Sequence, residues 1–340
     1  MADIQRNVDL KPFNTFGIPV NARYFTVINS VRDLVELIHT DLFRNERNLI
    51  LGGGSNILFT KNFDGLVIHN NLKGITFSGE TDQLISVTVA SGEPWHPFVL
   101  HCVRHGWGGI ENLALIPGTV GAAPIQNIGA YGVELKEVVE KVKGVELATG
   151  NERSFNKAEC LFGYRESIFK HELKENFFIS SVTLTLTRNK HNLRTDYGTI
   201  RTTLSEMHIA HPTIQSVCDA VIQIRSQKLP DPKVLGNSGS FFKNPVVPIE
   251  KYNALQKSHH NIPGYASENQ LVKIPAAWLI EQCGWKGKRI DKAGVHHMQA
   301  LVLVNYGGAT GEDILDLSRQ IQEDVEHNFG IFLAPEVNIM

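Results

Sequence analysis

Two glycine-rich segments constrain the fold of this chain more than any other feature of its sequence. LGGGSN (51–56) begins at the end of the apolar run NLIL, which predicts a short buried strand. IPGTVGAAPIQNIGAYG (116–132) shows little helical or strand periodicity. A loop of this kind lets its backbone approach a ligand closely, and its successive N–H groups can hold a pyrophosphate. LGGGSN matches neither GxGxxG nor the P-loop, so a turn that binds nothing is the alternative for that segment alone. Two such segments together favour one extended ligand that carries a diphosphate and rings.

A third stretch, GNSGSFFKNP (236–245), raises the question of what Ser240 does. It suits a nucleophile, a phosphate-binding hydroxyl or a proton donor over an apolar ligand, and a turn between strands is the ordinary alternative. The nucleophile pattern GxSxG fails because position 240 is Ser instead of Gly, and no nearby His serves as a base. The following FFKNP favours packing over an apolar ligand face, with Lys243 and Asn244 for an anionic group.

The composition argues against several classes of partner. Among 340 residues, 33 are basic and 35 acidic, and the net charge of -2 disfavours nucleic acid or an anionic membrane as the main partner. The start of the chain lacks a signal-peptide pattern, and no run of 18 apolar residues occurs, so we expect a soluble cytoplasmic protein. We also expect it to be a monomer.

The cysteines and histidines indicate no metal site. The sequence has four cysteines, which are far apart and form no CxxC: Cys102, Cys160, Cys218 and Cys283. We predict buried free thiols in a reducing compartment. His101 and His105 are spaced i, i+4 on a predicted helix, but no third ligand is in register with them.

Local patterns predict an α+β protein of two or three packed units. The expected helices cover 31–43 (capped by Asn29 or Ser30), 95–105, 214–224, 274–285 and 311–329, the last with a Thr310–Asp313 capping box and Gly330 at its end. The expected strands cover 48–51, 57–60, 66–70, 84–92, a hairpin over 142–155, 176–187, 300–305 and 331–339.

Three charged residues have two interpretations each. Arg165 in GYRESIFK (163–170) is either a functional residue or, as the ordinary alternative, part of a surface ion pair. Glu336 lies among apolar residues of the last predicted strand, where it is either solvent-facing or a buried, partly protonated acid. Lys228 opens the turn KLPDPK (228–233), where a solvated charge is the alternative to a ligand contact.

Together, NTFGI (14–18), LGGGSN, the segment 116–135, YRES (164–167), KLPDPK with GNSGSFFKNP, and PEV (335–337) resemble the UDP-N-acetylenolpyruvoylglucosamine reductase family, in order and over essentially the whole chain. The resemblance implies a flavoenzyme of bacterial peptidoglycan synthesis that uses FAD and NADPH to reduce a UDP-sugar enolpyruvyl ether to UDP-N-acetylmuramate. It also implies three α+β domains. Residues 1–72, and 73–228 with 330–340, would form a vanillyl-alcohol-oxidase-type FAD-binding unit, and 229–329 would bind the substrate.

The resemblance also implies the roles of individual residues. The catalytic positions fall on Ser240, Arg165 and Glu336. Arg165 and Glu336 would stabilise the negative charge that develops when hydride reaches the terminal vinyl carbon, and Ser240 would protonate the adjacent carbon. The implied FAD-binding residues are Gly52, Gly53, Gly54, Ser55, Asn56, Ile116, Pro117, Gly118, Gly121, Ala122, Gln126, Asn127 and Gly129.

The implied substrate-binding residues are Tyr197, Arg225, Lys228, Asn244 and Gln299, with Lys243 as a further candidate for the diphosphate. Tyr197, in RTDYGTI, resembles the mobile tyrosine loop of the longer family subtype. YRES departs from the family by carrying Glu166 in place of Asp. Two other functions stay open: a flavin oxidase of the same superfamily, which would reduce dioxygen without needing the serine, and a nucleotide-sugar-binding or transferase protein without flavin.

Overall fold

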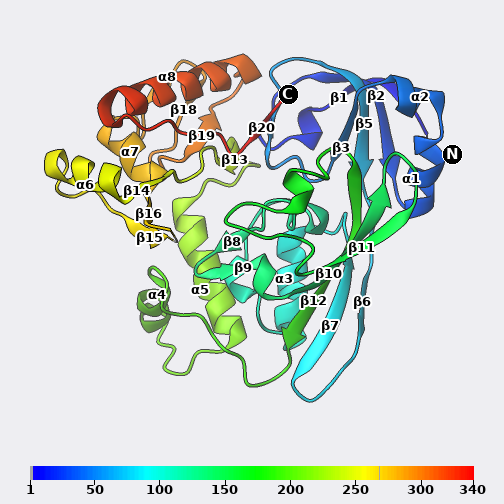
Figure 1. The fold of residues 1–340 in the computed structure, drawn as a ribbon, viewed down its shortest axis with the longest axis horizontal. Coiled ribbons are helices and arrows are strands. Elements are labelled where there is room, and N and C mark those ends of the chain that lie inside the picture. Colours follow the sequence, from blue (N-terminus) through cyan, green and yellow to red (C-terminus); the bar gives the residue numbers. More distant parts are fainter. Residues whose placement is uncertain (1–2, 268) are drawn as a thin grey trace. The chain divides into compact units, whose positions relative to one another are not determined.

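The computed structural model describes residues 3–267 and 269–340 and has an α+β fold (Figure 1). The chain divides into two compact units. Unit 1 comprises Met1–Val8, Ala22–Gly53 and Asp64–Gln227, and unit 2 comprises Asp9–Asn21, Gly54–Phe63 and Lys228–Met340. The boundaries of the three-domain scheme stay a prediction.

The first sheet of unit 1 has the order β1-β2-β5-β3. Its strands are Gln5–Asp9, Asn21–Ile28, Phe63–Asn70 and Asn48–Leu51, and β3 pairs with β5 in parallel. Helix α1 (Val31–Ile38) begins at a capping box between Ser30 and Asp33. The prediction of one helix over 31–43 is wrong, because Thr40 caps a separate helix α2 (Asp41–Asn45) by accepting a hydrogen bond from the backbone N–H of Phe43.

The second sheet of unit 1 is antiparallel, in the order β11-β10-β12-β7-β6. Its strands are Glu152–Asn156, Val139–Glu146, Phe177–Thr187, Leu84–Ala90 and Ile75–Ser78, which confirms the predicted hairpin and the two predicted strands that follow and precede it. The helices of this part are α3 (Trp95–Arg104), α4 (Ile200–Glu206) and α5 (Ile214–Lys228). A short ladder joins β8 (Gly129–Ala130) to β9 (Val133–Glu134) inside the second glycine-rich segment and its continuation.

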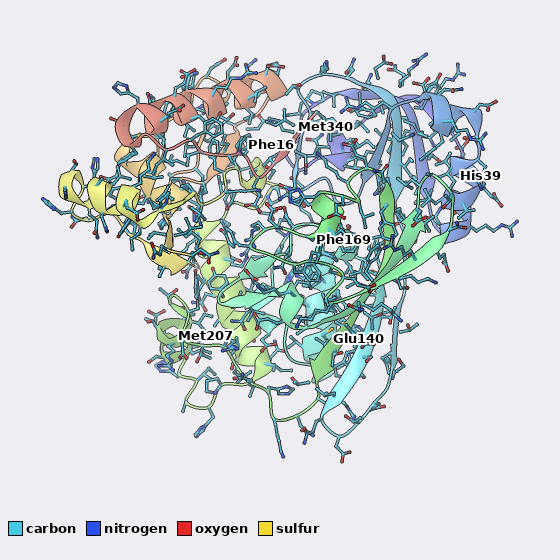
Figure 2. All side chains as sticks on the ribbon, in the orientation of Figure 1. Phe16, His39, Glu140, Phe169, Met207 and Met340 are labelled. Atoms are coloured by element: carbon cyan, nitrogen blue, oxygen red, sulfur yellow. The ribbon has the colours of Figure 1, made fainter. Side chains whose placement is uncertain are left out.

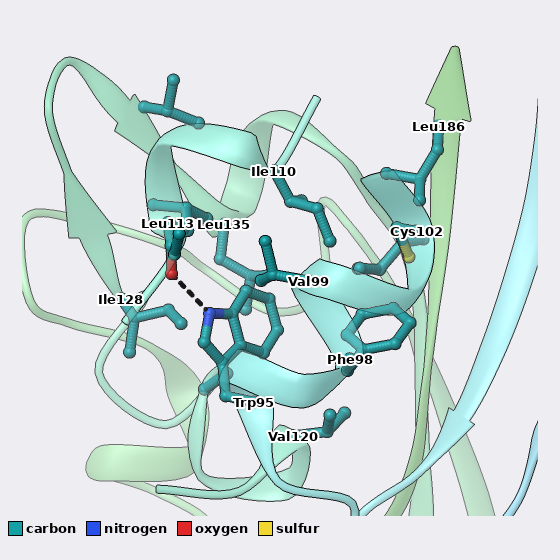
Figure 3. Close-up of a cluster of buried hydrophobic side chains, with 14 of the residues drawn as sticks. Trp95, Phe98, Val99, Cys102, Ile110, Leu113, Val120, Ile128, Leu135 and Leu186 are labelled. Carbon is teal, nitrogen blue, oxygen red and sulfur yellow. Dashed lines mark hydrogen bonds between the residues drawn. The ribbon is translucent and has the colours of Figure 1, made fainter. Parts of the chain in front are cut away.

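Two groups of buried side chains position the loops of unit 1. Trp95 and Phe98 of α3 lie in the main core, and the indole Nε1 of Trp95 donates to the carbonyl of Leu113 over 2.9 Å (Figure 3). This bond anchors the chain directly before the segment 116–132. Phe169, labelled in Figure 2, stacks with Phe177 and meets Phe155 edge-on, which anchors the chain after YRES.

Unit 2 is built around a sheet in the order β13-β19-β18-β17. These strands are Gly236–Ser240, Val302–Asn305, Ala293–Val295 and Arg289–Ile290. Helix α8 (Gly311–Phe329) packs on β18 and β19 and on α7 (Ala276–Gln282); it has the predicted Thr310–Asp313 capping box and ends at Gly330, whose φ is +61° (Figure 1). A smaller sheet, β14-β16-β15 (Val246–Pro248, Leu271–Lys273, Tyr265–Ser267), lies with helix α6 (Ile249–Ser258).

Two predictions about unit 2 are corrected. GNSGS forms strand β13 rather than a turn: its pairing with β19 shifts register between Asn237 and Ser240, where Gly239 takes a φ of +72°. The predicted strand over 331–339 is reduced to β20 (Asn338–Ile339), which pairs in parallel with β4 (Ile57–Leu58). Pro335 has no N–H to donate and forms an isolated bridge with Phe242.

The cysteines are free: Cys102, Cys160 and Cys218 are buried and Cys283 is half-buried. The prediction of buried free thiols is thus confirmed for the first three and is wrong for Cys283. Burial raises the pKa of the Cys160 and Cys218 thiols to about 12, which disfavours their reactive thiolate forms. Within the described part of the chain, no helix combines the length and apolarity that crossing a membrane requires.

Candidate functional site

The two glycine-rich segments touch backbone to backbone in unit 1. A Cβ atom added to Gly53 would lie 3.1 Å from the Cα of Gly118, and one added to Gly52 would lie 2.6 Å from the Oγ1 of Thr119. A Cβ on Gly121 would lie 2.5 Å from the Cβ of Ser91. Gly52 and Gly53 therefore allow the close approach of the two segments, and Gly121 allows the second segment to approach Ser91.

Backbone hydrogen bonds fix the second segment against the start of helix α3. The N–H of Trp95 donates to Gly118, and the N–H groups of Val120 and Gly121 donate to Glu93 and Ser91 over 2.8 and 2.9 Å. Gly53, Pro117 and Ala122 are exposed along the paired segments. Exposed positions with little or no side chain, such as Gly53 and Ala122, leave this surface open to a long ligand such as a dinucleotide.

The first glycine-rich segment continues into unit 2 at Gly54. Gly54 has a φ of +60°, and a Cβ there would lie 1.9 Å from the carbonyl oxygen of Phe13. The Gly54 carbonyl accepts from the N–H of Thr15 over 3.0 Å. Asn56 reaches the other end of the chain, since its Nδ2 donates to the Glu336 carbonyl over 3.3 Å.

Asn127 holds loops of the protein together through its side chain. It is fully buried with a φ of +42°. Its Nδ2 donates to the Gly163 carbonyl and to the Glu134 carboxylate over 2.9 and 3.1 Å, and its Oδ1 accepts from the N–H of Lys136. This amide therefore does not face a ligand's heterocycle. The backbone of Asn127 is bonded within the protein as well, since its N–H donates to the Pro124 carbonyl over 3.2 Å and its carbonyl accepts from Arg165.

Arg165 lies on a tight turn beside this segment. Its φ is +57°, a left-handed conformation that side-chain-bearing residues adopt rarely. Its guanidinium donates from Nη2 to the Gly129 carbonyl over 3.0 Å and from Nη1 toward the Asn127 carbonyl over 3.5 Å. The structure thus brings the predicted catalytic arginine to two of the predicted cofactor residues. Glu166, which stands where the resemblance implies Asp, contacts Nε2 of His171 through its carboxylate.

Tyr131, which was not among the predicted site residues, interacts with two that were, Tyr197 and Arg225. The Tyr131 and Tyr197 rings meet edge-on with centroids 6.3 Å apart, and the charge of Arg225 acts on Tyr131. Burial is the main cause that raises the pKa of Tyr131, and Arg225 opposes it. Tyr131 has a φ of +50° and lies between Gly129 and Gly132. Its place among the glycines of the segment 116–132 was the one sequence feature that could have marked it as a site residue.

The tyrosine loop is tied to the same hairpin by Asn112. Its Nδ2 donates to the carbonyl oxygens of Tyr131 and Arg194 over 3.0 and 2.8 Å. A Cβ on Gly132 would lie 3.3 Å from the Cβ of Tyr197, so the base of this side chain rests on the hairpin backbone. The Tyr197 side chain itself is 59% exposed, which leaves the ring accessible to a ligand.

Ser240 and Glu336 lie on neighbouring extended segments of unit 2. The N–H of Glu336 donates to the carbonyl of Phe241 over 2.8 Å, and the N–H of Lys243 donates to Ala334 over 2.9 Å. Ser240 is exposed at the end of β13 and Glu336 is half-buried. Ser238, by contrast, is 6% exposed with an Oγ that has no hydrogen-bond partner among the described residues.

The remaining predicted substrate residues have mixed surroundings. The Oδ1 of Asn244 accepts from the N–H of Ala276 over 2.9 Å and so stabilises the start of α7. Gln299 lies in the β18–β19 connection, where its Oε1 accepts from the N–H of Leu301 over 3.4 Å. Lys228 is exposed as the last residue of α5.

Comparison with known proteins gives two matching family models. One, described as an FAD binding domain, covers residues 22–155; the other, described as the C-terminal domain of UDP-N-acetylenolpyruvoylglucosamine reductase, covers residues 231–340. A UDP-N-acetylenolpyruvoylglucosamine reductase from Amoebophilus asiaticus is 50% identical over 338 residues, 99% of this chain and 99% of that protein. The chain belongs to the UDP-N-acetylenolpyruvoylglucosamine reductase family.

Further similarities agree with this membership. The UDP-N-acetylenolpyruvoylglucosamine reductase of Flavobacterium johnsoniae is 48% identical over 338 residues, 99% of this chain and 100% of that protein. The crystal structure of a UDP-N-acetylenolpyruvylglucosamine reductase from Thermus caldophilus superposes with a TM-score of 0.69 at 22% identity, over 100% of this chain and 99% of that one, and shows the same fold. The predicted fold class is confirmed, with an FAD-binding domain and the family's C-terminal domain.

Proposed function

We propose that this chain is the FAD-dependent, NADPH-oxidising reductase that converts UDP-N-acetyl-3-O-(1-carboxyvinyl)-glucosamine to UDP-N-acetylmuramate in peptidoglycan precursor synthesis. The observation that carries the proposal is full-length identity of 50% to a reductase of that name, together with family models for both the FAD-binding and C-terminal domains. We also propose that the protein is a cytoplasmic monomer. Tyr197, in its tyrosine loop, is the basis for assigning it to the longer family subtype.

FAD would be held by residues of the two glycine-rich segments. Their close approach through Gly53 and Gly118 provides exposed backbone without side chains, which suits a diphosphate and flat rings. When bound, FAD supplies hydride transfer from NADPH to the terminal vinyl carbon of the substrate. The chain's own side chains then have to bind the substrate, stabilise negative charge and move one proton.

Arg165 and Glu336 are proposed to stabilise the charge that appears on the carboxylate side of the substrate. Arg165 is suited to this role because two backbone carbonyls hold its guanidinium, so a fixed cation needs little reorganisation during the reaction. Glu336, protonated or sharing a proton, would add a hydrogen bond to the same group. Its backbone is fixed by the bond to Phe241.

Ser240 is proposed to deliver a proton from its hydroxyl to the carbon next to the one that receives hydride. The acceptor is carbanion-like, so the role depends more on position than on acidity. Ser240 suits it because its side chain is exposed at a strand end whose partner residue is Val302. Tyr197, Arg225, Lys228, Lys243, Asn244 and Gln299 are proposed to bind the polar groups of the nucleotide.

The experiment that tests this proposal combines colour with an assay of dioxygen use. The purified protein supplied with FAD is expected to be yellow. Without the enolpyruvyl nucleotide it should oxidise only the NADPH that reduces its own flavin, and continued oxidation of NADPH should require the nucleotide. A colourless protein that ignores added FAD would leave the nucleotide-sugar-binding or transferase alternative. Rapid dioxygen consumption without the nucleotide would instead favour the flavin oxidase.

A further inference from the structure

Two hydrogen bonds connect helix α3 to helix α5 through Leu115. The backbone N–H of Leu115 donates to Nδ1 of His96 over 3.0 Å, and the carbonyl of Leu115 accepts from Nη2 of Arg225 over 3.4 Å. Leu115 has a φ of +60°, which is unfavourable for a side chain of this kind. A residue in such a conformation persists only where its surroundings hold it. His96 and Arg225 supply hydrogen bonds at its two ends.

The Arg225 guanidinium has capacity to bind an anion. Its Nε is buried and has no hydrogen-bond partner in the part of the chain that the structure describes. Burial lowers the pKa of this guanidinium, and Tyr131 is the ionisable side chain that opposes the shift. A desolvated cation with an unused donor is costly unless a negative group meets it. The nucleotide substrate carries such groups in its diphosphate and carboxylate.

His96 can hold Leu115 only while its ring is neutral. Nδ1 accepts the Leu115 hydrogen bond, so the ring proton belongs on Nε2. Burial first, and the charge of Arg225 second, lower the pKa of His96 and keep this acceptor form present at lower pH than in an ordinary histidine. Arg225, from α5, is the charged group that acts on the ring, and Tyr131, from the β8–β9 hairpin, acts on Arg225 in turn. A protonated ring would present a donor to the Leu115 N–H and a second positive charge to Arg225.

We propose that His96 is a positioning residue for substrate binding: through Leu115, it orients the guanidinium of Arg225 toward an anionic group of the nucleotide. This inference rests on the proposed function, because that function supplies the anion. It assigns a task to a histidine that the motifs of the sequence do not mark.

The test measures binding of the enolpyruvyl nucleotide to the oxidised, FAD-loaded protein by calorimetry without NADPH, so that no turnover occurs. His96→Phe removes the acceptor and is expected to weaken binding about tenfold, in line with partial loss of one charge-assisted hydrogen bond. His96→Asn places Oδ1 near the position of Nδ1 and is expected to restore binding. His105→Phe, at the exposed end of the same helix, is the matched control and should bind like the wild type.

The pH dependence and a double variant distinguish positioning from a general structural role. Wild-type affinity is expected to fall as the pH drops through the lowered pKa of His96, and His96→Asn should lack this step. Combining His96→Phe with Arg225→Met should weaken binding little beyond Arg225→Met alone, because both changes act on one interaction.

Different failures have different meanings. If the wild type neither binds nor reduces the nucleotide, the proposed function falls. If the wild type binds the nucleotide and His96→Phe binds it equally well, the role of His96 is overturned. The same holds if the losses of binding free energy from His96→Phe and Arg225→Met add in full in the double variant. If His96→Phe loses FAD or fails to fold, the pH profile of His96→Asn decides: an unchanged acid-side step overturns the inference.

Discussion

The backbone N–H of Glu336 donates a hydrogen bond to the carbonyl oxygen of Phe241 over 2.8 Å. The bond joins the last segment of the chain to the residue that follows Ser240. A second hydrogen bond fixes the same segment, because the side chain of Asn56 donates to the Glu336 carbonyl. Unit 2 therefore holds two of the three proposed catalytic residues on a shared backbone framework, and their spacing does not depend on flexible side chains.

Replacing Ser240 with Ala should separate the two half-reactions. NADPH should still bleach the flavin at the wild-type rate, while its reoxidation by the nucleotide should slow about 10²- to 10⁴-fold, the range for loss of a general acid. Stopped-flow absorbance under anaerobic conditions measures both steps. Ser258→Ala, at the exposed end of α6, is the control. Equal slowing of both half-reactions in Ser240→Ala would show that Ser240 is structural.

Replacing Arg165 with Lys tests whether the planar guanidinium is needed. Lysine keeps the charge but cannot bond two carbonyl groups in the geometry that Gly129 and Asn127 provide. We expect the nucleotide half-reaction to slow by about tenfold or more, because one fixed interaction with developing charge is lost. Arg153→Lys on β11, whose guanidinium lies over Phe155, is the matched control. Wild-type kinetics in Arg165→Lys would show that the planar guanidinium of Arg165 is not needed.

Replacing Gly53 with Ala should weaken FAD binding. The added methyl group would lie 3.1 Å from the Cα of Gly118 and push apart the two segments. Overpacking of this kind costs about 1–3 kcal/mol, which corresponds to roughly 5- to 150-fold in the FAD dissociation constant if it acts on the bound state. Fluorescence titration of the apoprotein measures this constant, and thermal unfolding without FAD separates it from a general loss of stability.

Gly163→Ala is the control for that variant, because its methyl group would meet Glu166 at an ordinary 3.4 Å. An unchanged FAD dissociation constant in Gly53→Ala would place the cofactor away from these segments.

Replacing Tyr197 tests the tyrosine loop. Tyr197→Ala removes the ring that meets Tyr131 edge-on and should raise KM for the nucleotide about tenfold, while the rate of flavin reduction by NADPH stays unchanged. Tyr197→Phe keeps the ring and shows what the hydroxyl contributes. If Tyr197→Ala keeps both KM and turnover, the loop has no place in the substrate site.

Local features of the fold could be predicted well from the sequence. The Thr310–Asp313 capping box and the left-handed Gly330 bracket α8 as expected, because both signals lie within a few residues of the helix ends. The interpretation of GNSGS as a turn was wrong, because the signal for its strand β13 is not local. Glycine and serine have weak strand preference, and the partner strand β19 is distant in sequence, so pairing of Ser240 with Val302 is not visible locally.

The glycine-rich part of the candidate site could be predicted from the sequence, but its side-chain contacts could not. The contact of Gly53 with Gly118 follows from two segments that each avoid side chains. The side-chain contacts of Asn127 could not be read from the sequence, because its partners Gly163 and Glu134 come from separate loops. His96 likewise has no motif around it, and its importance depends on the conformation of Leu115.

Anaerobic titration of the purified, FAD-loaded protein, followed by flavin absorbance, tests the proposed reduction of the nucleotide most directly. NADPH is added first until the yellow colour is bleached, and the enolpyruvyl nucleotide is then added. We expect one equivalent of nucleotide to restore the colour and UDP-N-acetylmuramate to be formed in the same amount. A flavin that NADPH bleaches but the nucleotide does not reoxidise would contradict the proposed function.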